Sequence, residues 1–121
     1  MEKHFKTSRE ENSMANILLC CNEGVSTSFL VKKMQQVADD NGLKVKIWAV
    51  SEPKVDTESK SADIVLLGPQ IAFMRDTIAE RLGTRIPVQA INAEDFGRLN
   101  ASKILKEGLL LIRENRAKQD K

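Results

Sequence analysis

The sequence predicts an α/β domain in which a four-stranded parallel sheet carries helices on both faces. Strand-like and helix-like apolar patterns alternate along the 121 residues, in the order βαβαβαβα. Two of the expected strands are continuous apolar runs, which is typical of strands buried on both faces. Apolar residues make up 41% of the chain and aromatic residues only 4%, so the core must be aliphatic.

The first half of the chain contains two expected strands and two expected helices. Ser26 and Thr27 are both suitable N-caps for a helix whose apolar residues repeat on one face. Asn41-Gly42 is a typical stop for that helix. The expected elements are a strand at 15–20, a helix from Ser26 or Thr27 to Asn41, a strand at 43–50 and a short, partly exposed helix within 52–61.

The second half repeats the alternation and ends in a long helix. Gly68-Pro69-Gln70 predicts a turn after a buried strand, and Gly83 ends the helix that follows. Basic residues are concentrated in the last turns of the final helix, where they interact favourably with its dipole. The expected elements are strands at 62–67 and 87–91 and helices at 71–82 and 101–118, with an irregular segment or one short turn at 92–100.

Alternating strands and helices imply right-handed crossovers, and with four strands we expect the flavodoxin-like order 2-1-3-4. The strand order then reverses between the first and third strands. Ligands bind at such a point, outside the carboxyl ends of the strands. Both the segment that begins at Cys21 and Gly68-Pro69-Gln70 fall at this edge. The fold therefore predicts one site formed by these two loops.

Charge and composition exclude several classes of function. A net charge of +2 is too small to indicate nucleic-acid binding, and no apolar run is long enough to span a bilayer. His4 is the only histidine, so a zinc site lacks ligands and we expect no metal and no cofactor. No segment has the pattern of a signal peptide, and Cys20 and Cys21 are the only cysteines. We expect a cytoplasmic monomer with reduced thiols.

The chain is expected to form one domain with a short extension. Residues 1–13 are polar and charged without any apolar period, which predicts a flexible polar extension. Residues 14–121 are then a single domain, since their length suits one core.

The segment from Cys21 to Ser28 joins the first strand to the first helix and has the composition of an anion site. It contains a cysteine, a glycine and three hydroxyl residues. Free backbone N–H groups and the positive end of the helix dipole attract anions there. The same field favours a thiolate over a thiol, so Cys21 is the candidate nucleophile. Cys20 continues the strand and is expected to be a small core residue.

Two motifs resemble one family. Leu18-Leu19-Cys20-Cys21-Asn22-Glu23-Gly24-Val25-Ser26-Thr27-Ser28 and Asp63-Ile64-Val65-Leu66-Leu67-Gly68-Pro69-Gln70-Ile71-Ala72 are similar to motifs of the IIB component of the bacterial sugar phosphotransferase system, in its lactose/cellobiose/chitobiose branch. The resemblance implies that Cys21 accepts a phosphoryl group from a phosphohistidine of a IIA protein. The group then passes to a sugar bound by the membrane permease IIC, to which the chain is peripheral.

The resemblance also implies roles for the neighbouring residues. The phosphate-binding loop would comprise Asn22, Glu23, Gly24, Val25, Ser26, Thr27 and Ser28, and the loop of Gly68, Pro69 and Gln70 would shape the site. Asn22 and Glu23 are larger and more polar than the residues typical of the family. Because a carboxylate is unfavourable beside a phosphate, Glu23 is expected to face solvent. A disaccharide of the cellobiose or chitobiose type is the expected sugar.

Two other functions fit the same fold. A low-molecular-weight tyrosine-phosphatase-like hydrolase also has a cysteine-led phosphate loop after its first strand. It requires an arginine at the sixth position after the cysteine, for bidentate phosphate binding, and Thr27 occupies that position here. A non-catalytic flavodoxin-like regulator is the other alternative, and it predicts that no phosphoryl group becomes covalently attached.

Overall fold

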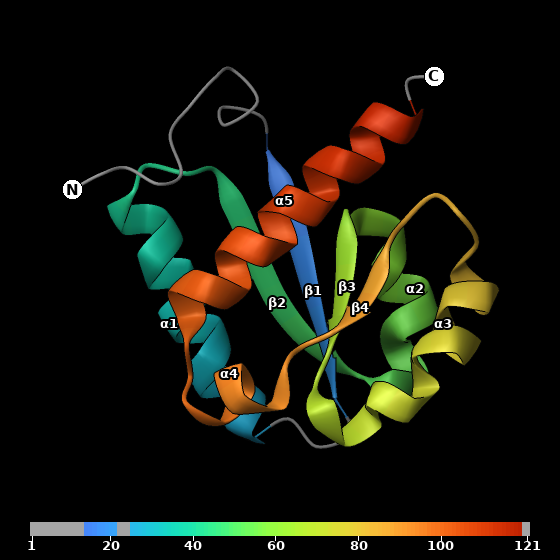
Figure 1. The fold of residues 1–121 in the computed structure, drawn as a ribbon, viewed down its shortest axis with the longest axis horizontal. Coiled ribbons are helices and arrows are strands. Elements are labelled where there is room, and N and C mark those ends of the chain that lie inside the picture. Colours follow the sequence, from blue (N-terminus) through green and yellow to red (C-terminus); the bar gives the residue numbers. More distant parts are fainter. Residues whose placement is uncertain (1–13, 22–24, 120–121) are drawn as a thin grey trace.

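The computed structural model describes residues 14–21 and 25–119 and has the predicted α/β architecture (Figure 1). Four parallel strands form one sheet in the order β2-β1-β3-β4, as the sequence predicted. The expected flexible extension, residues 1–13, lies outside the described residues, as do Asn22, Glu23 and Gly24. No helix in the described part of the chain is long and apolar enough to cross a membrane.

Strands and helices alternate along the chain, with short 3-10 segments between them. The strands are β1 (Ala15–Cys21), β2 (Val45–Ser51), β3 (Ile64–Leu67) and β4 (Val88–Ala90). The helices are α1 (Val25–Asp40), α2 (Val55–Glu58), α3 (Arg75–Leu82), α4 (Ala93–Gly97) and α5 (Ala101–Gln119). The 3-10 segments are η2 (Glu52–Lys54), η3 (Ser59–Ser61) and η4 (Pro69–Met74).

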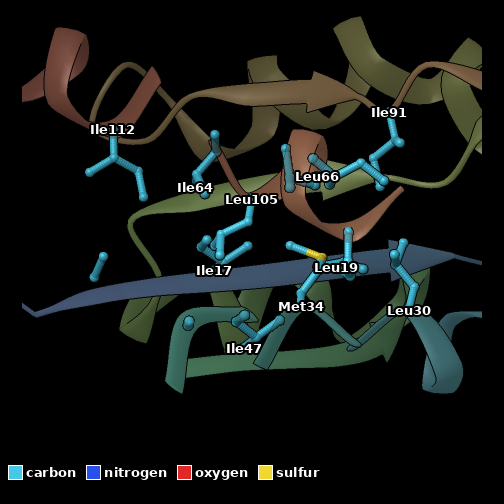
Figure 2. Close-up of a cluster of buried hydrophobic side chains, with 14 of the residues drawn as sticks. Ile17, Leu19, Leu30, Met34, Ile47, Ile64, Leu66, Ile91, Leu105 and Ile112 are labelled. Atoms are coloured by element: carbon cyan, nitrogen blue, oxygen red, sulfur yellow. The ribbon is translucent and has the colours of Figure 1, made fainter. Parts of the chain in front are cut away.

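Side chains of β1 point alternately into two separate cores, one on each face of the sheet. Ile17 and Leu19 pack with α1 and α5 on one face, where Figure 2 shows them among Leu30, Met34 and Leu105. Leu18 and Cys20 belong to the second core, which is formed with α2, η4 and α3. The period of two along a strand therefore sends Cys20 and Cys21 to opposite faces.

Several element boundaries differ from those predicted, and two of these differences affect the candidate site. β1 continues through Cys21, which pairs with Ser51 of β2, so this cysteine ends the strand and does not begin the loop. α1 begins at Val25, so Ser26 and Thr27 lie inside its first turn and the prediction that one of them caps it is wrong. The helix expected at 71–82 begins only at Arg75, because Ile71 has φ −121° and ψ 24°, outside helical values.

The amino end of the sheet is held by a polar cluster opposite the candidate site. Asp63 Oδ2 accepts a 2.7 Å hydrogen bond from the Asn16 backbone N–H. Arg116, near the end of α5, lies 3.5 Å from the same carboxylate oxygen and donates to the Met14 carbonyl at 3.0 Å. These contacts fix where the chain enters β1, which is the strand that carries Cys21.

Candidate functional site

Cys21 lies at the carboxyl end of the central strand β1 and contacts the first turn of α1. Its Sγ lies 3.0 Å from Thr27 Oγ1, and this pair shares a buried hydrogen bond. The exposed fractions of Cys21 and Thr27 are only 4% and 1%. A hydroxyl both donates and accepts, whereas a thiolate only accepts, so Thr27 is the donor whenever Cys21 is ionised. The geometry thus provides a fixed hydrogen bond to a sulfur anion.

Cys20 has a different environment from its neighbour, as the sequence predicted. It is fully buried in the core formed with α2 and α3. Burial, helped by the negative charge of Glu52, raises the pKa of Cys20 to about 12. Its sulfur therefore stays a neutral thiol at physiological pH, which makes it a core residue and a poor nucleophile.

The start of α1 presents backbone N–H groups close to Cys21. The first four N–H groups of an α-helix have no partner inside the helix, and the helix dipole gives this end a partial positive charge. Val25, Ser26, Thr27 and Ser28 are the first four residues of α1, and none of the first-turn residues is acidic. No acidic side chain in this first turn therefore repels an anion bound at the start of α1. The expectation that Glu23 faces solvent lies outside the described residues.

The loop after β3 meets Cys21 from the neighbouring strand. The Gly68 N–H donates to the Cys20 carbonyl at 2.9 Å, which extends the β1–β3 pairing by one residue. A Cβ atom at Gly68 would lie 3.4 Å from Cys21 Sγ and 2.7 Å from Gln70 Oε1. The absence of a side chain at Gly68 therefore leaves space in which the Gln70 carboxamide approaches the cysteine.

Two arginines outside the candidate site stabilise the fold. Arg81 of α3 bonds Asp56 at 2.8 Å and Glu52 at 3.1 Å, which ties α3 to α2 and η2. Arg85 donates to the carbonyl of Ser59 at 2.8 Å. Neither contact involves Cys21 or Gly68, so neither arginine acts as a phosphate clamp in this arrangement.

Comparison with known proteins identifies the family. A family model described as the lactose/cellobiose-specific IIB subunit of the PTS, the sugar phosphotransferase system, matches residues 16–107. The chain belongs to this family. It is accordingly a sugar phosphotransferase component, and the fold above is that of a PTS IIB domain of the lactose/cellobiose type.

Relatives with different stated sugars resemble this IIB domain. The cellobiose-specific EIIB component of Lactococcus lactis subsp. lactis is 40% identical over 95 residues, which is 74% of this chain and 88% of the relative. The oligo-beta-mannoside-specific EIIB component of Bacillus subtilis is 35% identical over 100 residues, 82% of this chain and 97% of the relative. The galactose-specific EIIB component of Lactococcus lactis subsp. cremoris is 39% identical over 95 residues, 74% of this chain and 88% of the relative.

Solved structures agree with the IIB fold. The cellobiose-specific phosphotransferase IIB component of Borrelia burgdorferi matches with a TM-score of 0.73 and 31% identity, covering 85% of this chain and 95% of that one. The lactose-specific IIB domain of Streptococcus pneumoniae matches with a TM-score of 0.66 and 19% identity, covering 85% and 98%. The second similarity concerns the fold alone.

The prediction from the sequence missed two contacts around Cys21 in this IIB domain. It grouped Thr27 with the phosphate-binding hydroxyls, whereas the Thr27 hydroxyl contacts the cysteine sulfur itself. It treated Gly68 and Gln70 only as a turn that shapes the site. A signal for the Thr27 contact was available, because the third residue of a helix points back toward the preceding turn.

Proposed function

We propose that this IIB domain carries a phosphoryl group on Cys21. The group would come from a phosphohistidine of a IIA partner and pass to a sugar bound by a membrane IIC permease. The single observation that carries the proposal is the buried contact between Cys21 Sγ and the Thr27 hydroxyl, 3.0 Å long, beside the first turn of α1. Membership of the IIB family, over a match that includes both residues, supports it independently.

The first transfer is an in-line displacement. The Cys21 thiolate attacks phosphorus, the S–P bond forms as the N–P bond of phosphohistidine breaks, and imidazole leaves with the electron pair. Because little acid–base work is needed, positioning and charge stabilisation supply most of the rate. Thr27 is proposed to hold the sulfur in line, and the N–H groups of Val25 to Ser28 to bind the phosphoryl oxygens.

The second transfer regenerates the thiolate. A sugar hydroxyl attacks phosphorus on the opposite side, its proton passes to a base, and Sγ leaves with the S–P electron pair. The negatively charged leaving group then regains the Thr27 hydroxyl as its hydrogen-bond donor, which lowers the cost of cleavage. One hydroxyl would thus serve both transfers.

A phosphatase is a weaker alternative for this arrangement. Its chemistry needs an arginine that grips the phosphate dianion in a bidentate manner. Thr27 stands at that position, and its hydroxyl is already bonded to the sulfur. Arg81 and Arg85 bond other groups, Asp56 and the Ser59 carbonyl respectively. A carrier benefits from this difference, since slow hydrolysis preserves the phosphoryl group for the sugar.

The proposed partners imply a cellular location and a sugar for this domain. Its IIA donor and IIC acceptor would place it at the cytoplasmic face of the membrane, as a monomer that is peripheral to the permease. We propose a cellobiose- or chitobiose-type disaccharide as the sugar, in line with the cellobiose-specific relatives. The galactose-specific relative is almost as similar, so the permease and not this chain is expected to select the sugar.

Intact mass measurement tests the carrier function. The full chain is incubated with a cellobiose-type IIA protein that has been phosphorylated on histidine, and a gain of one phosphoryl group is expected. Cys21→Ser should abolish the gain, while Cys20→Ala and His4→Ala should retain it. Release of inorganic phosphate without a sugar acceptor would favour the phosphatase, and the absence of any gain would favour the regulator. Uptake that is lost in Cys20→Ala but kept in Cys21→Ser would overturn the assignment.

A further inference from the structure

A neutral side chain stands beside the candidate nucleophile and has no role in the scheme above. Gln70 is an exposed residue of η4, yet its Oε1 lies over Gly68, 2.7 Å from the point where a Cβ of that glycine would be. Cys21 Sγ lies 3.4 Å from the same point. The Gln70 Oε1 and Cys21 Sγ atoms therefore cannot be farther apart than these two distances together, which is about 6 Å.

At this upper limit, the Oε1–Sγ distance leaves room for a contact through a phosphoryl group. An oxygen of a phosphoryl group on sulfur lies about 3 Å from Sγ, and a hydrogen bond adds about 2.9 Å. A half-turn of the carboxamide exchanges Oε1 for the donor Nε2, and this last torsion of a glutamine is soft. Within the part of the chain that the structure describes, the Gln70 carboxamide has no hydrogen-bond partner that would resist the turn.

From this geometry we infer that Gln70 donates a hydrogen bond to the phosphoryl group on Cys21, and that Gly68 lacks a side chain so that the carboxamide can reach it. The inference rests on the proposed carrier function and adds a phosphoryl-contacting residue outside the Cys21–Ser28 segment. Gln70 lies in η4, just after β3 on the other side of the switch point, so the phosphoryl group would be held between the carboxyl ends of β1 and β3.

The chemistry of a carboxamide suits a carrier. Two N–H groups bind an anion without adding a charge, so they hold the group more weakly than an arginine does. Weak holding favours release to the next acceptor. A carboxylate of the same shape would repel the phosphoryl group, which makes Gln70→Glu the informative opposite of Gln70→Ala.

Gly68 offers an independent way to displace the carboxamide. The backbone at Gly68, with φ −62° and ψ 154°, is extended and accepts any L-residue. The added Cβ of Gly68→Ala would lie 2.7 Å from Gln70 Oε1, so the flexible glutamine must move away. Its 3.4 Å distance to Cys21 Sγ is tolerable, so the nucleophile stays in place. Gly68→Ala should therefore act through Gln70.

The experiment measures the initial rate of phosphoryl transfer from a phosphorylated cellobiose-type IIA protein to the full chain. Loss of a hydrogen bond to a charged group at an exposed site predicts roughly a tenfold slower rate for Gln70→Ala. Gly68→Ala should be slowed to a similar extent, and Gln70→Glu more. Gly68→Ala added to Gln70→Ala should cost nothing further. Gln36→Ala, at an exposed glutamine of α1, is the matched control and should keep the full rate.

An NMR measurement distinguishes a direct contact between Gln70 and the phosphoryl group from an effect of the substitutions on folding. On phosphorylation of ¹⁵N-labelled protein, the side-chain N–H signals of Gln70 should shift downfield, while those of Gln36 stay unchanged. An unmoved Gln70 signal on a phosphorylated chain, or a Gln70→Ala rate equal to wild type, would overturn the inference alone. A wild-type chain that takes up no phosphoryl group would overturn the carrier function and this inference with it.

Discussion

Replacing Thr27 by valine tests whether the buried hydroxyl serves the cysteine sulfur. Valine has nearly the shape of threonine but no hydroxyl, so Thr27→Val removes the 3.0 Å contact to Cys21 Sγ without opening a cavity. Thr27 is 1% exposed, so water cannot replace the lost donor. The variant therefore isolates the hydrogen bond from packing.

The expected effect differs between the resting protein and the reaction. A hydrogen bond to a neutral thiol is weak, so we expect the free energy of unfolding to change by about 1 kcal/mol or less, which is about 4 °C in Tm for a domain of this size. A hydrogen bond to a charged group contributes about 1.5–3 kcal/mol. Losing it from the attacking thiolate predicts a transfer rate roughly 10- to 100-fold lower.

Rapid-quench intact mass spectrometry with a phosphorylated IIA donor measures the rate, and a thermal melt measures stability. Thr27→Ser keeps the hydroxyl and should recover most of the rate, although it removes a buried methyl group. Thr77→Val, at an exposed threonine of α3, is the control and should leave both measurements unchanged. A Thr27→Val variant that transfers at the wild-type rate would exclude the proposed role of the hydroxyl, and so would a Thr27→Ser variant that is as slow as Thr27→Val.

Three further predictions concern stability. The pKa of Cys20 is raised from an ordinary value of 9.0 to about 12, so between these pH values the thiol stays protonated in the native state but ionises in the unfolded state. The stability that Cys20 contributes is therefore fully present below pH 9 and is lost as the pH rises toward 12. At pH 10, denaturant titration should show wild type losing about 1.4 kcal/mol more than Cys20→Ala, relative to pH 8, and equal losses would contradict the assigned burial. Removing residues 1–13 should leave Tm nearly unchanged, because that segment has no apolar period, and a fall of several degrees would mean that it packs on the domain. Arg116→Ala should lower stability by about 1 kcal/mol or less, since its contacts to Asp63 and Met14 are partly exposed, and a transfer rate altered as well would show that the amino end of the sheet is coupled to the site.

The fold could be predicted from the sequence because each local signal agreed with the global arrangement. The continuous apolar run at Ile64–Leu67 identified a doubly buried strand, and Asn41-Gly42 ended α1 where Gly42 adopts a positive φ of 69°. The position of Cys20 within the expected strand already assigned it to the core, where it is buried. Boundaries were less certain, because strand pairing with Ser51 extends β1 to Cys21 and no local preference encodes that pairing.

The sheet order, the family and the residue proposed to carry the phosphoryl group could all be inferred from the amino-acid sequence, because apolar periodicity and motif spacing are local properties of the chain. The way in which the parts of the site meet depends on how separate elements pack together. The Thr27 hydroxyl reaches the sulfur because α1 begins at Val25 and its first turn rests against the end of β1. Gln70 and Gly68 approach Cys21 because β3 pairs with β1, across more than forty residues of sequence. Contacts of this kind depend on the packing of separate elements, and packing is fixed by the whole core and not by any one segment.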